Sequence, residues 1–145
     1  MPQYFSRIAL VVLVPVAALV AACGNNPVSP STTATTRTIE YFSGTLPPDA
    51  PQFYSFTSSV SGTTDITLIS LRPPGVVTET LSDVVALGLG TPAGTGCAVA
   101  TSVNASPGLI AQLSTATTAT TYCVDLRNAG TLTGSADFTI RILHP

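Results

Sequence analysis

The sequence predicts an all-β protein, an antiparallel β-sandwich of jelly-roll type with about eight short strands. Beyond residue 36, no stretch keeps apolar residues at the spacing of an amphipathic helix for long. β-Branched residues, which favour strands, dominate that part of the chain, and threonine alone occurs 23 times in the sequence. Turn-forming residues recur about every 8 to 15 positions, a spacing typical of short strands joined by tight connections.

The expected strands follow one another from residue 38 to the end of the chain. They cover residues 38–42, 52–57, 66–71, 84–89, 97–103, 109–113, 121–126 and 137–143. Clusters of proline, glycine and asparagine separate them, at residues 44–49, 72–75, 92–94, 104–108 and 128–130. Alternating apolar side chains mark the faces expected to point inward, namely Val85, Leu87, Leu89, Tyr122, Val124, Leu126, Phe138, Ile140 and Ile142.

An apolar segment precedes this domain and indicates export. Residues 8–22 are fifteen consecutive residues without a polar side chain, and Arg7 supplies a positive charge ahead of them. A membrane-spanning helix needs about 20 apolar residues, whereas a run of about 7 to 15 behind a basic start is typical of a signal peptide. We therefore expect a signal peptide at residues 1–22.

The end of the apolar run, Val20-Ala21-Ala22-Cys23, resembles the lipobox of bacterial lipoproteins. The resemblance implies cleavage before Cys23 and acylation of that cysteine, including a palmitate-type chain, so that lipid anchors the protein in the bacterial cell envelope. Ordinary secretory cleavage after Ala22 and an uncleaved anchor helix are the alternatives. No aspartate directly follows Cys23, which favours the outer membrane in a cell that has two membranes.

The segment after the lipobox reads as a tether. Residues 24–36 are small, polar and interrupted by proline, with no aromatic side chain among them. An unstructured chain of that length spans roughly 20 Å, which holds a domain clear of the lipid headgroups. The expected organisation is thus a lipidated cysteine with a flexible tether at 23–36 and a β-sandwich domain at 37–145.

The cysteine count fits an exported lipoprotein. The chain has three cysteines, and assigning Cys23 to lipid leaves Cys97 and Cys123 as a pair. Disulfides persist in oxidising compartments, so we predict a Cys97–Cys123 disulfide. Buried unpaired thiols are one alternative; a metal site is another, although two sulfurs with no nearby histidine do not fill a tetrahedral site.

Six short motifs are shared with a known family. They are, in chain order, Phe42-Ser43-Gly44-Thr45-Leu46, Tyr54-Ser55-Phe56-Thr57, Val60-Ser61-Gly62-Thr63, Ile66-Thr67-Leu68, Thr121-Tyr122-Cys123-Val124 and Phe138-Thr139-Ile140. In these motifs the chain resembles the bacterial pre-peptidase C-terminal domain. The resemblance implies a compact jelly-roll sandwich that acts as a non-catalytic module in secretion or in binding macromolecules. Residues 84–89 are apolar where family members often carry an acidic strand, so a calcium role is not carried over.

Few residues have side chains suited to catalysis, metal binding or nucleic-acid binding. Five basic residues, all arginine, against seven carboxylates give a net charge of −2, which excludes a nucleic-acid binder and a polybasic membrane-surface module. His144, the single histidine, is next to last and is expected to be a solvated tail, so no Ser-His-Asp or Cys-His arrangement is expected. Glu79 and Asp83 lie in an expected loop and are too few for calcium. We expect no catalytic residues, no cofactor and no metal.

The function expected from these observations is a binding or assembly module. The domain would be non-catalytic, would reach the membrane through its lipid anchor, and would take an envelope protein or a polysaccharide as partner. Tyr41, Phe53 and Tyr54 are candidates for a platform on which sugar rings stack, although aromatic side chains in strands are more often part of the core. The alternatives are a small secreted hydrolase that uses Glu79 or Asp83, and a structural surface protein without a ligand.

Overall fold

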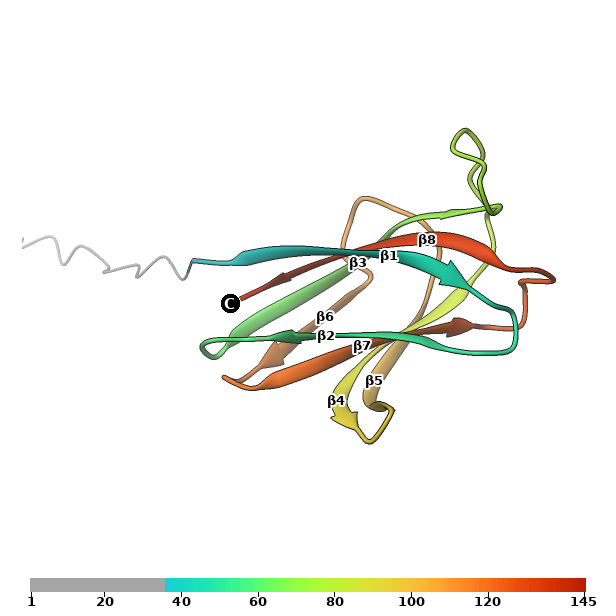
Figure 1. The fold of residues 1–145 in the computed structure, drawn as a ribbon. Coiled ribbons are helices and arrows are strands. Elements are labelled where there is room, and N and C mark those ends of the chain that lie inside the picture. Colours follow the sequence, from blue (N-terminus) through green and yellow to red (C-terminus); the bar gives the residue numbers. More distant parts are fainter. Residues whose placement is uncertain (1–35) are drawn as a thin grey trace, which may run out of the picture. The chain divides into compact units, whose positions relative to one another are not determined.

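The computed structural model describes residues 36–145, and these residues form eight strands without a helix, which confirms the all-β prediction (Figure 1). The strands are β1 (Thr38–Leu46), β2 (Gln52–Thr57), β3 (Gly62–Arg72), β4 (Val85–Ala93), β5 (Gly96–Ala105), β6 (Leu113–Thr117), β7 (Thr121–Asn128) and β8 (Ala136–His144). Among the described residues, nothing helical is long and apolar enough to cross a membrane.

The strands form two four-stranded antiparallel sheets, one above the other in Figure 1. The β1 sheet has the order β1-β8-β3-β6, and the β2 sheet has the order β2-β7-β4-β5. Each strand of the first half pairs with one of the second half, because β1 pairs with β8, β2 with β7, β3 with β6 and β4 with β5. This nesting is one long hairpin rolled into two layers, and it confirms the jelly-roll type.

The core lies between the two sheets and follows the alternation of the strands. In β8, alternate residues from Ala136 to His144 are buried, and the residues between them face outward and are half-buried. The side chains predicted to point inward are all buried except Tyr122, which is half-buried and packs against the core. Leu46, Phe56, Ile66, Leu68, Leu71 and Leu113 complete much of the apolar interior.

One expected strand is wrong. Residues 109–113 form a loop up to Leu113, where β6 begins, and Leu109 and Ile110 are 82% and 83% exposed. The loop is held beside β3 by two backbone bonds, from the Gly108 N–H to the Leu68 carbonyl and from the Gln112 N–H to the Ile66 carbonyl. The threonine-rich strand β6 was missed because one buried leucine opens it and the rest of its alternation is polar.

Several expected turn residues lie inside strands, among them Gly44 and Pro92. Gly44 belongs to β1, where an added Cβ would lie 2.5 Å from the hydroxyl oxygen of Tyr54, a residue of the facing sheet. A close approach between the sheets, and no turn, therefore explains that glycine. Pro92 belongs to β4, near the end of the β4–β5 hairpin, where it is opposite Cys97.

Candidate functional site

The residues predicted for the anchor cannot be placed. The signal peptide at 1–22, Cys23 and the tether lie outside the described residues, apart from Thr36. Membrane attachment therefore rests on the sequence.

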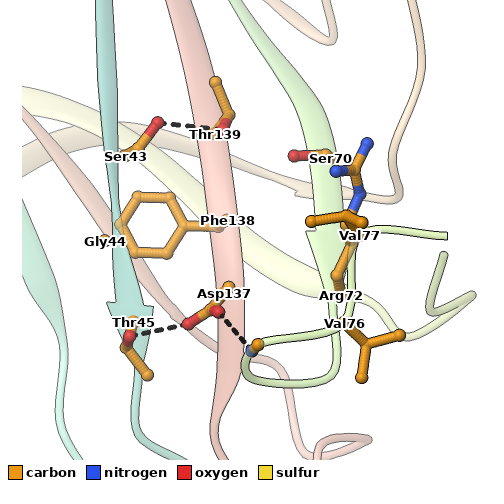
Figure 2. A pocket seen from close by; sticks show the side chains of 11 residues that line it. Ser43, Gly44, Thr45, Ser70, Arg72, Val76, Val77, Asp137, Phe138 and Thr139 are labelled. Carbon is orange, nitrogen blue, oxygen red and sulfur yellow. Dashed lines mark hydrogen bonds between the residues drawn. The ribbon is translucent and has the colours of Figure 1, made fainter. Parts of the chain in front are cut away.

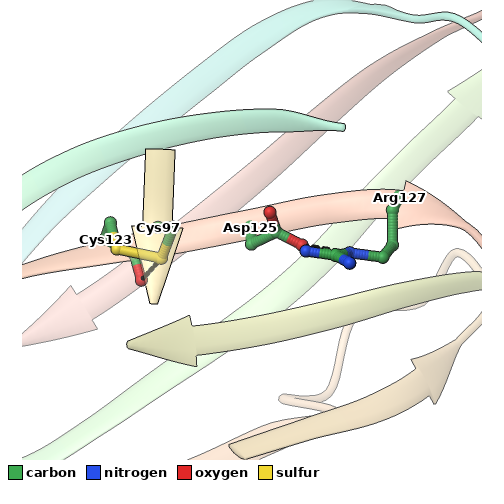
Figure 3. Close-up of a disulfide and its surroundings, with 4 residues drawn as sticks. All are labelled: Cys97, Cys123, Asp125 and Arg127. Atoms are coloured by element: carbon green, nitrogen blue, oxygen red, sulfur yellow. Dashed lines mark hydrogen bonds and ion pairs between the residues drawn. A yellow bond between two sulfur atoms is a disulfide. The ribbon is translucent and has the colours of Figure 1, made fainter. Parts of the chain in front are cut away.

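The predicted disulfide is confirmed and links two strands that are not neighbours (Figure 3). Cys97 lies in β5 and Cys123 in β7, with β4 between them, yet their Cα atoms are 5.8 Å apart. Two steps across a flat sheet measure about 9.6 Å, so the start of β5 folds over the outer face of β4. The β4–β5 register shifts at Gly90, the point where this fold-over occurs.

Glycines in β4 make room for this fold-over. At Gly90 an added Cβ would lie 2.6 Å from the Ala98 carbonyl carbon, and at Gly88 it would lie 2.8 Å from a methyl carbon of Val99. The fold-over helps to explain why Cys123 and Asp125, which lie on the outward side of β7, are buried. Arg127 also contacts Asp125 on this outward side, because its Nε donates a hydrogen bond to the Asp125 carboxylate over 2.6 Å (Figure 3).

The two loop carboxylates do not form a shared site. Glu79 is exposed and Asp83 is half-buried, and both lie in the connection between β3 and β4. Asp83 lines a small hollow of about 190 Å³ to which Glu79 does not contribute. Within residues 36–145, no three acidic, histidine or cysteine side chains gather where they could hold a metal ion.

The expectation that His144 is a solvated tail is wrong. His144 is 2% exposed because β8 continues to this residue and its inward alternation brings the ring into the sandwich. The ring lies 4.9 Å from that of Phe56, and Nε2 is 2.9 Å from the Glu40 carboxylate. The histidine thus closes one end of the core between β1 and β2.

The candidate aromatic platform is split by the fold. Tyr41 is exposed on the outer face of the β1 sheet, whereas Phe53 is exposed on the β2 sheet. Tyr54 packs into the interior, with its ring 4.8 Å from that of Phe42 and 6.0 Å from that of Phe138. Tyr41 lies two residues before Ser43, which lines a hollow.

That hollow is a cavity of about 400 Å³ on the outer face of the β1 sheet (Figure 2). The strand register brings two rows of three residues side by side across β1, β8 and β3. The rows are Ser43, Thr139 and Ser70, and Thr45, Asp137 and Arg72. Because four of these six side chains carry a hydroxyl group, we call this site the hydroxyl cavity. Its volume is at the lower end of the range for small-molecule sites, about 300 to 1,000 Å³.

A tight turn after β3 forms one wall of the cavity. The Val76 N–H donates to the Pro73 carbonyl over 3.1 Å, and Gly75 has a φ of 74°, a value that suits glycine at the third position of a type II turn. Val76 and Val77 add an apolar wall. The run Arg72-Pro73-Pro74-Gly75 was expected only to end a strand, and it also shapes this site.

Asp137 holds the turn against the sheet. Its carboxylate accepts hydrogen bonds from the Gly75 N–H over 2.9 Å and from the Thr45 hydroxyl over 2.7 Å, one on each oxygen. The bond from the Gly75 backbone, followed by that from Thr45, lowers the pKa of Asp137 because both stabilise the ionised form. Asp137 is therefore negatively charged, and each of its carboxylate oxygens already accepts one hydrogen bond that fixes the turn to the sheet.

Arg72 has no such partner. The guanidinium groups of Arg37, Arg127 and Arg141 each donate hydrogen bonds to protein oxygens, but nothing in the described part of the chain pairs with that of Arg72. Its Nε is buried without an acceptor. Figure 2 shows the guanidinium extended toward Ser70 and Val77, away from the Asp137 carboxylate. A buried donor without a protein partner costs about 1 to 3 kcal/mol unless a water or a ligand accepts its hydrogen bond.

Sequence reasoning did not find this cavity. Its six floor residues come from three strands that are distant in the sequence, and the sheet register alone brings them together. No spacing motif marks them, and alternating polar residues in strands normally indicate a solvated face.

Comparison of the chain with models of known protein families gave no match, and comparison with curated proteins gave no significant match.

Proposed function

We propose that this protein is a lipid-anchored component of the bacterial cell envelope whose β-sandwich is a non-catalytic module that binds polysaccharide. The observation that carries the binding role is the unpartnered Arg72 guanidinium in a cavity of about 400 Å³. The hydroxyl cavity is its ligand site. Its volume lies within the range of ligand sites, and its polar groups could orient a polar ligand.

Two features favour a polysaccharide over a protein partner. The cavity floor is rich in serine and threonine hydroxyl groups, residues that are under-represented at protein hot spots, and Val77 in the wall is the one large exposed apolar side chain among the lining residues. Tyr41 is 60% exposed and lies two residues before Ser43, on the same face of β1. Its Cα is thus about 7 Å along the strand from that of Ser43, a spacing that would let the ring stack on the next sugar of a chain.

The envelope location is supported by the lipobox residues and by the disulfide. A Cys97–Cys123 bond fits an oxidising compartment, where such bonds persist. The outer membrane is the proposed site in a cell with two membranes, and the module is of the pre-peptidase C-terminal type that the sequence motifs resemble.

Labelling with palmitate tests the anchor. We expect radioactive palmitate to enter the wild-type chain expressed in a bacterium and to be lost completely in Cys23→Ala, because Cys23 supplies the acylated thiol and amine. A Cys97→Ala/Cys123→Ala double variant is the control and should remain labelled. Incorporation that survives Cys23→Ala contradicts the anchor.

Sedimentation with insoluble envelope polysaccharide tests the binding role. The wild-type mature chain is expected to co-sediment, and Ser43→Trp is expected to weaken binding by at least about tenfold because the indole fills the cavity. Ser55→Trp is the matched control, since Ser55 is an exposed strand residue of the β2 sheet.

Three results would contradict this proposal. One is equal binding by the wild type and Ser43→Trp. Another is a stoichiometric envelope protein recovered in place of polysaccharide. The third is release of soluble sugar that depends on both Glu79 and Asp83, which favours the hydrolase alternative.

A further inference from the structure

We infer that the hydroxyl cavity selects a sugar that carries a carboxylate, and that the terminal nitrogens of Arg72 bind this carboxylate. The inference rests on the proposed polysaccharide-binding function and specifies the chemical class of its ligand. It rests on the hydrogen-bond donors of the cavity that have no partner in the protein.

The donors of the cavity that have no protein partner are concentrated on Arg72. Among buried side-chain atoms of the described residues, Nε of Arg72 is the one without a partner; the terminal nitrogens of Arg72 also lack one but are open to solvent. The Ser70 hydroxyl makes no side-chain hydrogen bond within the described residues. Ser43 and Thr139 share one hydrogen bond of 2.9 Å, which leaves one of their two hydroxyl protons for a ligand.

The charged acceptor of the cavity, Asp137, is already partly engaged. Both oxygens of Asp137 already accept a hydrogen bond, from Gly75 and from Thr45. A ligand that pairs with Arg72 brings acceptors of its own, because a guanidinium can only donate hydrogen bonds. A guanidinium presents planar paired donors whose geometry matches the two oxygens of a carboxylate.

The charge of the site favours a carboxylate over a phosphate. Arg72 supplies one positive charge, and Asp137, its register neighbour on β8, keeps a negative charge close by. Arg72 and the ionised Asp137 together are neutral, so Asp137 repels any anion in the cavity and repels a dianion about twice as strongly as a monoanion. The hydroxyl groups and the Tyr41 ring suit the remainder of a sugar ring and its neighbour.

The Nε atom positions the arginine for this role. Nε is packed against the protein, so the guanidinium is held in place by its stem and its burial, with no ion pair. The terminal nitrogens then face a ligand without first breaking a bond to the protein. Arg37 differs in this respect, because it forms an ion pair with Asp65 over 2.7 Å.

Calorimetric titration of the mature chain with four small probes tests the inference. The probes are glucuronate, glucose, acetate and inorganic phosphate. We expect glucuronate to bind about tenfold to a hundredfold more tightly than glucose, as a charge-assisted pair predicts, and more tightly than acetate or phosphate. Arg72→Gln is expected to remove the preference for glucuronate over glucose, and Arg72→Lys to restore only part of it, because lysine keeps the charge and loses the fork.

Arg37→Gln is the control, since it removes the same charge from the same face outside the cavity. It should keep the preference for glucuronate. If glucuronate and glucose bind equally and Ser43→Trp abolishes both, the inferred selection of a carboxylate is wrong. The proposed sugar site is then still supported. Phosphate or acetate that binds as tightly as glucuronate also overturns the inferred selection. Absence of binding by every probe, together with no co-sedimentation with polysaccharide, overturns the proposed function itself.

Discussion

Replacing Gly90 with alanine is expected to lower the free energy of unfolding by about 3 kcal/mol or more and to impair formation of the Cys97–Cys123 disulfide. The added Cβ would lie 2.6 Å from the Ala98 carbonyl carbon and 2.7 Å from the Val99 Cα, both backbone atoms of the strand that folds over β4. Backbone atoms on a paired strand cannot move aside as the end of a side chain can. Urea denaturation and a count of reactive thiols measure the two effects.

Gly134→Ala is the matched control for this substitution. An added Cβ at Gly134 meets no atom within 4 Å, and the residue does not have a positive φ. We expect a change within about 0.5 kcal/mol, the usual effect of a surface substitution. If Gly90→Ala and Gly134→Ala unfold at the same urea concentration and both keep the disulfide, the fold-over of β5 is wrong.

Removing the disulfide is the second large effect. The bond closes a loop with a sequence separation of 26, and the chain-entropy model gives it about 3.5 kcal/mol. Domains of this kind have a total stability of about 5 to 15 kcal/mol, so a Cys97→Ala/Cys123→Ala variant should lose a large part of it. The variant is expected to unfold at a clearly lower urea concentration than the oxidised wild type.

Reduced wild-type protein separates the covalent link from packing, because it keeps both sulfur atoms. Cys123 is fully buried, so truncating it also removes contacts in the sheet. We expect the reduced wild type to lose most of the stability that the disulfide contributes. The double alanine variant should be slightly less stable again. A reduced protein as stable as the oxidised one would show that the bond adds nothing to the fold.

The sequence was a good guide to strands whose alternation is apolar. Val85, Leu87 and Leu89, and likewise Phe138, Ile140 and Ile142, were predicted to point inward and are buried. Their alternation matches the observed burial because the opposite sheet covers one face of each strand.

Where polar residues make a strand, the same approach failed. β6 contains one apolar anchor, Leu113, and its remaining residues are serine, threonine and alanine, which read as a connection. His144 shows the reverse error, since a polar residue near a terminus was taken for a tail although it lies on the inward face of β8. Local composition does not reveal which strand will cover such residues.

The cavity was unpredictable for a topological reason. Ser43, Ser70 and Thr139 become neighbours only because β8 inserts between β1 and β3. Nothing in the sequence near Arg72 indicates that its guanidinium lacks a partner, because that property depends on where the fold directs the side chain, which extends away from the Asp137 carboxylate (Figure 2). The disulfide, in contrast, followed from counting cysteines.

The outer face of the β1 sheet is proposed to bind envelope polysaccharide. The most direct measurement is an amide chemical-shift map of the isotope-labelled mature chain titrated with soluble fragments of that polysaccharide. We expect the largest shifts at Ser43, Ser70, Gly75 and Thr139, the residues that line the cavity. Saturable shifts confined to the β2 sheet, or no saturable shift at all, would contradict the claim.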